Sequence, residues 1–337
     1  MIDDFDNAIA RYAEFLGGNL GRSDNTVHKY QGYLARLKKF LVTKKQNHET
    51  ADQASLDEFT GMHLIMQGLR PAGRKPVISC VKGFFAWAQR NNIRLDNPAK
   101  HVVAPKVPSH FPNIMQLRDA ERLLQQPDLT TLIGVRDAAI IATFIGCGFR
   151  MSGVTNLNES SLIWTEDELN REVLIIKVEE KGKKQRMVPA PDEVRLLIRA
   201  YMGHPELAPV VRDLDDGDKV LFVSTRNYNV PSYNYYGEAR RLSTKTIDDM
   251  LKKYGKRAGI DPKVVHAHSL RHLYGTELAE ANVNILHMKA LLGHVKTDTV
   301  DIYNHTALRR LRAESAKGNP LGKINTPVTQ LMRELNK

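Results

Sequence analysis

The sequence feature that most constrains the fold is a nearly uniform apolar run from Ala138 to Phe149. A helix that is apolar on every side must be enclosed by other elements, so this run predicts the centre of a domain. The run is too short to cross a bilayer, which takes about 20 apolar residues. It ends at Gly146-Cys147-Gly148, and Arg150 follows closely. An arginine at the end of a buried helix is either paired structurally or directed into a site, and its position alone does not decide which.

A proline-rich segment divides the chain. Residues 102–112 contain Pro105, Pro108 and Pro112 and show no periodicity, which predicts an extended linker. A length of 337 residues also exceeds the usual size of a single core. We therefore expect a helical domain at residues 1–104, a linker at 105–112, a mainly helical domain with a small antiparallel sheet at 113–318, and a tail helix at 319–337.

The first domain is predicted to be a helical bundle. Apolar residues recur at helical spacing in four runs, Phe5 to Leu16, Val27 to Leu41, Phe59 to Leu69 and Ile78 to Ala88. Basic residues gather on the second helix and around the start of the fourth. Solvated helix faces commonly carry such charges, but two basic clusters on one bundle also suit contact with DNA phosphates. The candidate DNA-binding residues are Lys29, Arg36, Lys39, Arg74, Lys75 and Lys82.

The composition of the whole chain favours the same kind of partner. Forty-nine Lys and Arg against 38 Asp and Glu give a formal net charge of +11, which favours a polyanion. The N-terminus is acidic where a secretion signal would be basic, so we expect a cytoplasmic protein without membrane segments. Cys80 and Cys147 each lie alone in apolar segments, and we expect buried thiols rather than a disulfide or a thiolate metal site.

A small antiparallel sheet is predicted from the β-prone runs 161–164, 173–178 and 186–189. The turn before the last run contains Lys181, and a lysine in an exposed hairpin turn is usually inert. Another apolar strand is predicted at Val220 to Val223. The Tyr- and Asn-rich loop at 227–237 that follows it either stacks on bases or is a mobile insertion.

The residues best suited to chemistry lie between His268 and Tyr303. His268, Arg271 and His272 have the i, i+3, i+4 spacing that places them on one helix face. Histidines four residues apart can bind zinc, but zinc sites need neutral or anionic ligands, and Arg271 is a permanent cation. A guanidinium instead grips phosphate with two hydrogen bonds, and a phenol can act as a nucleophile. This combination therefore suggests phosphate chemistry.

In order and spacing, these residues resemble the C-terminal signature of the tyrosine recombinases, the family of phage integrases, Xer proteins and Cre-like enzymes. The matching elements are His268-x-x-Arg271-His272, Leu291-Leu292-Gly293-His294 and Tyr303, nine residues beyond His294. Upstream, residues 148–152 resemble the family's first-arginine box, and residues 181–186 resemble its β-hairpin lysine. The first third of the chain is similar to the family's helical core-binding domain. The resemblance covers most of the chain and implies a two-domain clamp on DNA.

The resemblance implies a site-specific recombinase of double-stranded DNA. Arg150 and Arg271 would hold the scissile phosphate, and Tyr303 would attack it to form a 3′-phosphotyrosyl link. One phosphoester replaces another in this reaction, so neither a metal nor another cofactor is expected. The remaining implied roles are Lys181 as general acid, His268 as general base, His294 as a hydrogen-bond donor to the phosphate, and His272 as a structural or supporting residue.

One position departs from the family pattern. Gly153 stands where an acidic residue usually follows the first arginine by three positions. Either another acidic residue substitutes for the missing carboxylate, or the site is organised less firmly before DNA binds. The missing carboxylate also suits a catalytically weak DNA-binding protein of the same fold. The other alternative is an enzyme resembling the type IB topoisomerases, which share the tyrosine chemistry without exchanging partner strands.

The final segment is expected to be an amphipathic helix, because apolar residues recur there at i, i+3, i+4 and i+7. The family precedent is docking on a neighbouring protomer, and the connector at 318–327 gives the segment reach. The resemblance therefore implies a homotetramer on a specific DNA site, with strand exchange through a Holliday junction. Packing of the helix on its own domain is the alternative. The expected oligomerisation residues are Val328, Leu331, Met332 and Leu335.

Overall fold

The computed structural model describes residues 4–107, 113–180, 184–227, 230–293 and 305–329. The chain separates into two units, Met1–His110 and Phe111–Lys337, and the division falls within the segment predicted to be a linker. Each unit has its own hydrophobic core. Among the described residues, no helix combines the length and the apolar content that crossing a membrane requires.

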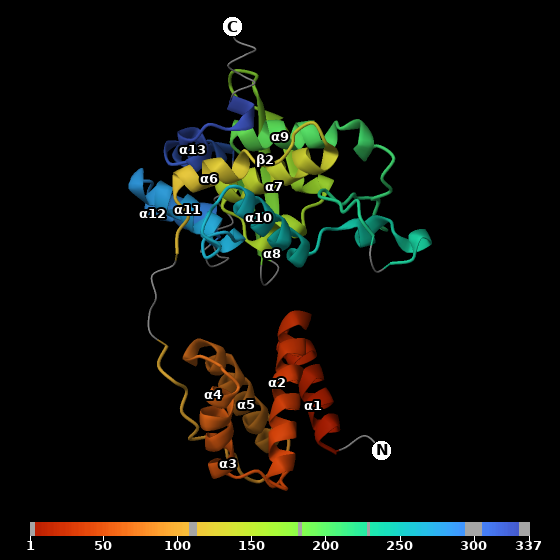
Figure 1. The fold of residues 1–337 in the computed structure, drawn as a ribbon, viewed down its shortest axis with the longest axis vertical. Helices are drawn as coiled ribbons and strands as arrows, with labels where there is room; N and C mark the ends of the chain where they lie inside the picture. Colours follow the sequence, from red (N-terminus) through yellow and green to blue (C-terminus); the bar gives the residue numbers. More distant parts are fainter. Residues whose placement is uncertain (1–3, 108–112, 181–183, 228–229, 294–304, 330–337) are drawn as a thin grey trace. The chain divides into compact units, whose positions relative to one another are not determined.

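The N-terminal unit is a helical bundle (Figure 1). Its apolar side chains form a buried core between the helices. Helices α1 and α2 pack together, and α2 also contacts α5. At the centre, the ring of Tyr12 lies 5.5 Å from that of Phe84 and 5.2 Å from that of Trp87, between ring centroids. The elements are α1 (Asp4–Glu14), a π-helical turn (Phe15–Asn19), α2 (Asp24–Thr43), α3 (Gln53–Glu58), a π-helical turn (Phe59–His63), α4 (Leu64–Met66) and α5 (Pro71–Arg90).

The third helical run of this unit is not the continuous apolar stripe that the sequence predicts. Phe59 and Leu64 are fully buried, whereas Met62 and Met66 are 59% and 81% exposed. A π-helical turn from Phe59 to His63 interrupts the α-helix, and its wider turn rotates the following residues away from the 3.6-residue repeat. Spacing alone therefore assigned these two methionines to the wrong face.

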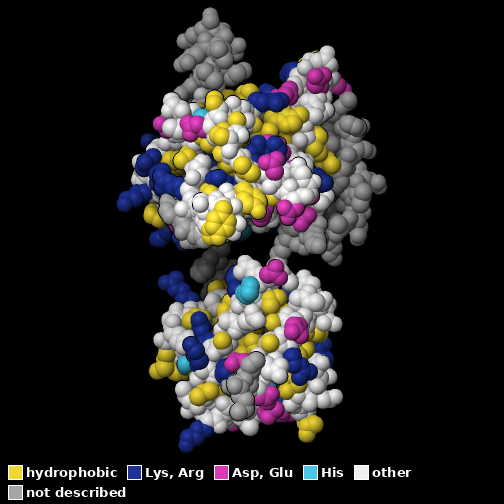
Figure 2. Space-filling model, turned by 90° about the vertical axis from the view of Figure 1, so that its right-hand side faces the viewer, with side chains coloured by type: hydrophobic (Ala, Val, Ile, Leu, Met, Phe, Trp, Pro, Cys, Tyr) yellow, Lys and Arg dark blue, Asp and Glu magenta, His cyan; other side chains and the backbone are white. Residues whose placement is uncertain are grey.

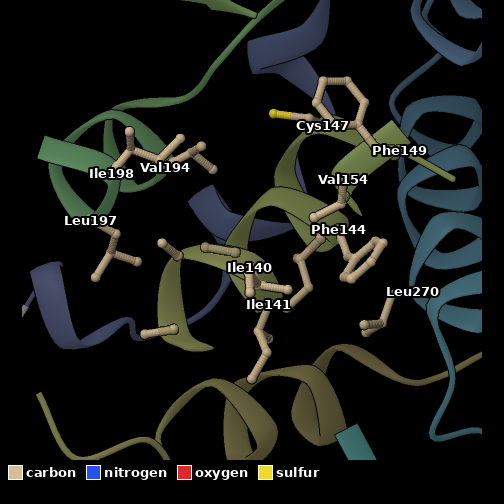
Figure 3. Packing of buried hydrophobic residues seen from close by; sticks show 14 of the residues in the cluster. Ile140, Ile141, Phe144, Cys147, Phe149, Val154, Val194, Leu197, Ile198 and Leu270 are labelled. Atoms are coloured by element: carbon tan, nitrogen blue, oxygen red, sulfur yellow. The ribbon is translucent and has the colours of Figure 1, made fainter. Parts of the chain in front are cut away.

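The C-terminal unit is built around α7 (Leu132–Cys147), as the apolar run predicts. Every residue of α7 from Gly134 onward is buried. Figure 3 shows Ile140, Ile141 and Phe144 of α7 between side chains of α9 and Leu270 of α11. The other helices are α6 (Leu117–Leu124), α8 (Met151–Thr155), α9 (Asp192–Met202), α10 (Thr244–Arg257), α11 (Ala267–Glu280), α12 (Ile285–Leu292) and α13 (His305–Lys317). Short 3₁₀ turns lie at Glu159–Ser161, Pro205–Leu207, Ser232–Asn234, Gly237–Arg240 and Pro320–Lys323.

Two charged residues inside α7 are fully engaged by neighbouring groups. The Arg136 guanidinium donates to Asp137 at 2.9 and 2.6 Å and to the Val223 carbonyl at 2.7 Å. The Tyr254 hydroxyl donates to the second Asp137 oxygen at 2.9 Å. Buried charges are tolerated when they are paired and hydrogen-bonded in this way. This network ties the central helix to α10 and to the segment before the Tyr-rich loop.

The small antiparallel sheet is confirmed. Its strands are β1 (Leu162–Glu166), β2 (Glu172–Glu180) and β3 (Lys184–Pro189), in the order β1-β2-β3. Val178 of β2 pairs with Arg186 of β3, so these two side chains share one face of the sheet. The strand predicted at Val220 to Val223 is wrong, because these buried residues make only isolated bridges, from Val220 to Asn158 and from Val223 to Arg241.

After α13 the chain turns back onto its own unit. Leu321, Ile324 and Val328 are buried in the C-terminal core at 1%, 8% and 8% exposure. Of the predicted oligomerisation residues, Val328 thus packs within its own unit. Leu331, Met332 and Leu335 lie outside the described residues.

Candidate active site

The end of α7 positions Arg150. Gly148 adopts a left-handed conformation at φ +60°, and its N–H donates to the Phe144 carbonyl at 3.2 Å. A Cβ at this position would lie 2.3 Å from Cδ1 of Tyr274, so both conformation and packing require glycine. The turn leaves Arg150 half-buried at the start of α8. The pKa of Arg150 is lowered, first by burial and then by the nearby positive charge of Arg186.

The second predicted arginine is held against this same turn. Arg271 of α11 is 6% exposed, and its Nη1 donates to the Gly148 carbonyl at 2.6 Å. Its Nη2 donates to the carbonyl of Leu292, at the end of α12. Burial and the positive charges of Arg186 and Arg150 lower the pKa of Arg271 to about 9, so Arg271 is a cation at neutral pH. Arg150 and Arg271, which are 121 positions apart, therefore meet at the end of α7.

The two predicted histidines lie on α11 beside Arg271. His268 is exposed, and its ring centroid lies 5.3 Å from that of the half-buried His272 in an edge-to-face arrangement. The pKa of His268 is lowered by partial desolvation and then by the positive charges of His272 and Arg271. A lowered pKa keeps the His268 imidazole neutral at pH 7, which is the form that accepts a proton.

Lys181, His294 and Tyr303 lie outside the described residues, but the elements that flank them converge. In the sequence, Lys181 lies between the end of β2 and the start of β3. His294 follows α12, whose Leu292 carbonyl accepts from Arg271, and Tyr303 precedes α13 by two positions. Both α12 and α13 contact β3. The strand that follows Lys181 in the chain thus contacts both the helix before His294 and the helix after Tyr303.

Gly153 is buried where α8 packs on the sheet. A Cβ at this position would lie 2.9 Å from Cγ2 of Val178, closer than real contacts allow. Any larger residue at 153 would require Val178 to move. Val178 of β2 thus occupies the space that a side chain at position 153 would need, so the packing of β2 fits glycine at this position.

The predicted DNA-binding residues lie on α2 and α5 of the N-terminal unit. Lys29, Lys39 and Lys75 are exposed, and Arg36 and Arg74 are half-buried. The Lys82 ammonium donates to the Val102 carbonyl at 2.9 Å, so it also holds the end of its own unit. On the face shown in Figure 2, Lys and Arg side chains of this unit are spread among hydrophobic and acidic ones.

The sequence did not single out Arg186, which is buried near the two arginines. Arg186 is 5% exposed, and its positive charge acts on both Arg150 and Arg271. The sequence did contain a signal for this. Arg186 and Val188 are two residues apart on a strand, so their side chains share the inward face, where a cation is unexpected. Among the described residues, one group of three donors could hold a metal ion, and it is formed by Asp4, His48 and Glu49 in the N-terminal unit.

The Tyr-rich loop has a fixed base and exposed rings. The Tyr235 ring is buried beneath the Arg240 guanidinium at 3.8 Å, and its hydroxyl lies 2.8 Å from the carbonyls of Ser224 and Arg226. Tyr233 and Tyr236 are 78% and 53% exposed. The described part of this loop is therefore anchored by its own contacts, while two aromatic rings remain open to a partner.

The fold and the paired arginines define a tyrosine-type site-specific recombinase. Residues 113–310 match the model of the phage integrase family, and residues 9–92 match the model of the phage integrase N-terminal SAM-like domain. The chain belongs to the phage integrase family.

Similar proteins agree with this assignment. The chain is 30% identical to tyrosine recombinase XerD of Pseudomonas putida over 93% of this chain and 97% of that protein. It is 27% identical to XerD of Proteus mirabilis over 95% of each chain. Its fold resembles that of the XerH site-specific recombinase in a pre-cleavage complex with its difH substrate, with a TM-score of 0.61 at 17% identity, over 93% of this chain and 97% of that chain.

The packing of Gly153 against Val178 generates a test of stability. Gly153→Ala gains up to about 1 kcal/mol of helix propensity but overpacks the core at a cost of about 1–3 kcal/mol. We expect a net loss in the free energy of unfolding of the C-terminal unit, measured with urea. In a Val178→Ala background the same substitution should be neutral or stabilising, because the contact has been removed. An equal cost in both backgrounds would contradict this packing.

Proposed function

We propose that this chain cuts double-stranded DNA at a specific site through a 3′-phosphotyrosyl intermediate and rejoins the strands through a Holliday junction. The observation that best supports the proposal is the hydrogen bond from Arg271 Nη1 to the Gly148 carbonyl. This bond holds the Arg271 guanidinium against the turn that leads directly to Arg150, the second cation. Two cations so placed can hold the non-bridging oxygens of one phosphate.

In the proposed reaction, the Tyr303 oxygen forms a bond to phosphorus while the bond from phosphorus to the DNA 5′ oxygen breaks. His268 takes the phenol proton, and Lys181 protonates the leaving oxygen. Arg150, Arg271 and His294 stabilise the charge that grows on the phosphate, and His272 supports His268 from the next turn. The energy of the phosphoester is retained in the tyrosine link, so rejoining is the reverse attack by a 5′ hydroxyl.

The N-terminal unit would hold the DNA through its phosphates. Lys29, Arg36, Lys39, Arg74 and Lys75 are the proposed contacts, and Lys82 contributes charge while it holds the Val102 carbonyl. The net charge of +11 supports a polyanionic partner. The similar XerH structure contains its difH substrate, which supports the same kind of partner here.

A homotetramer would bring two DNA sites together. Val328 packs within its own unit, so any exchange between protomers would use the segment after it, with Leu331, Met332 and Leu335 as the proposed contacts. In this proposal the exchanged tail would begin after Val328, which is buried in the core of its own unit.

A second candidate function is that of a catalytically weak DNA-binding protein. The observation that favours it is the buried Gly153, which supplies no carboxylate to orient the basic residues. Covalent capture of DNA distinguishes this candidate from the recombinase. An adduct accompanied by relaxation of supercoils without strand exchange would indicate the topoisomerase-like alternative.

Capture requires a nicked duplex that carries the recognition sequence, selected beforehand by binding from a random pool. The fragment released on cleavage diffuses away, so the covalent complex accumulates. We expect an adduct with the wild-type chain and none with Tyr303→Phe, although the variant still binds. Arg271→Gln should lower the adduct rate by about 10²–10³-fold, because it removes a donor to the transition-state charge.

Tyr233→Phe is the matched control, because it removes the hydroxyl of an exposed tyrosine in the same unit. It should form the adduct at the wild-type rate. Binding without any adduct in the wild type would favour the weak DNA-binding protein.

The environment of His268 predicts the pH dependence of adduct formation. A lowered pKa means that the base stays neutral to a more acidic pH, so the rate should fall only below the ordinary histidine value of about 6.5. His272→Gln removes one of the positive charges that lower this pKa, and should move the acid limb to higher pH. An acid limb above 6.5 in the wild type, or one that His272→Gln leaves in place, would contradict this role of His268.

A further inference from the structure

Helix α13, which begins two positions after Tyr303, packs on the C-terminal core along one face. Leu311 and Ser315, one turn apart on this helix, are 2% and 4% exposed. The Ser315 hydroxyl lies 3.0 Å from the hydroxyl of Tyr274 in α11. These contacts hold the helix against the core, but contacts along one face restrict rotation about the helix axis only weakly.

The neighbouring face of α13 lines an open groove instead of packing against side chains. The groove has a volume of about 560 Å³, and it is lined by Arg312, Ala313 and Ala316 of α13 together with residues of all three strands and of the turn between β1 and β2. The two alanine side chains are too short to fill this space. Close packing therefore does not fix the helix on this side.

Arg312 connects α13 to the turn between β1 and β2. Its Nη1 donates to Oδ2 of Asp167 at 3.1 Å, and the Asp167 side chain is 14% exposed. The turn itself holds this carboxylate. Oδ1 accepts from the N–H groups of Leu169 and Arg171 at 2.9 and 3.0 Å, and Oδ2 accepts from the Arg171 guanidinium at 2.9 Å. These bonds, those of Arg171 most strongly, keep the pKa of Asp167 below its usual range, so the acceptor is charged and fixed independently of Arg312.

We propose that the bond from Arg312 to Asp167 sets the rotation of α13 and thereby positions Tyr303 for attack, which makes Arg312 a positioning residue of the reaction. Position 312 lies about 100° around the helix from position 311, so the bond restrains the rotation that the core contacts permit. A rotation of about 20° moves a side-chain atom at a radius of about 5 Å by about 2 Å. A displacement of about 1 Å at a reacting atom can cost about 10²-fold in rate. The inference rests on the proposed function in taking Tyr303 as the nucleophile.

An ion pair that only stabilised the fold would behave differently. When Arg312 is removed, Asp167 keeps Arg171 as a partner, so no carboxylate is left unpaired. The melting temperature of the C-terminal unit should therefore change by no more than about 4 °C. What is lost is the restraint on α13, and its loss should appear in the rate of the reaction.

The test measures adduct formation by the full-length protein on the nicked duplex, and DNA affinity is measured separately. Arg312→Gln should form the adduct at least about tenfold more slowly at saturating DNA, because the nucleophile is less well positioned. Its DNA affinity should stay within about threefold of wild type. Arg312→Lys can donate the same bond to Asp167 and should recover most of the rate. A smaller loss in Arg312→Gln, or a lysine variant no faster than the glutamine variant, would overturn the proposal.

Arg171→Gln is the matched control, because it removes the other guanidinium from the same carboxylate and leaves the bond to Arg312 in place. It should form the adduct at the wild-type rate. Asp167→Asn keeps Oδ1 as the acceptor for the backbone N–H groups but replaces Oδ2, and it should be as slow as Arg312→Gln. Because both substitutions break one contact, the double variant should be no slower than either single variant. Losses that multiply in the double variant would contradict a shared contact.

Amide hydrogen exchange of the protein without DNA separates this inference from the proposed function. Peptides from α13 should exchange about fivefold faster in Arg312→Gln than in wild type or Arg171→Gln, because the helix opens more often when the contact is lost. If the wild-type chain forms no adduct, the proposed function fails, and exchange alone decides whether Arg312 restrains α13: faster exchange supports the restraint, and equal exchange rejects it. If wild type and Arg312→Gln form the adduct at equal rates, only the role of Arg312 is rejected.

Discussion

The hydrogen bond between Arg271 and the Gly148 carbonyl is the contact on which the rest of the site depends. It forms because α7 ends in a left-handed glycine that directs its carbonyl toward α11 and sends the chain into Arg150. Tyr274 packs where a Cβ of that glycine would lie, and its hydroxyl is 3.0 Å from Ser315 of α13. One turn therefore fixes two arginines and links them to the helix that follows the proposed nucleophile.

The apolar core explains why this turn is rigid. Helix α7 is buried on all sides, and its two charged residues are held by α10 and by the segment at Val220 to Val223. A close-packed helix cannot rotate or slide without breaking many contacts, so its end is a stable reference point. Arg150, Arg186 and Arg271 bring positive charge close to that end. In the proposed reaction, the positive charges of Arg150 and Arg271 would stabilise the phosphate in the transition state.

The sequence predicted those features that depend on local spacing or on short motifs. Periodicity identified α7 and most of the bundle, and the motifs predicted Arg150, Arg271 and His268 as site residues. Periodicity failed at Met62 and Met66, because a π-helical turn changed the helical repeat. The strand predicted at Val220 to Val223 was wrong, because a buried apolar run without a strand partner has the same sequence pattern as a buried strand. The position of Arg186, buried near Arg150 and Arg271, was not predicted because it depends on contacts between distant parts of the chain. Such long-range contacts have no counterpart in the spacing of one strand.

The central claim is that Tyr303 joins DNA at the site organised by Arg150 and Arg271. The most direct measurement is mass spectrometry of a trypsin-digested covalent complex. The account predicts that the DNA 3′ phosphate is attached to the peptide from Thr297 to Arg309, whose single tyrosine is Tyr303. Attachment to any other peptide, or through a 5′ phosphate, would contradict it.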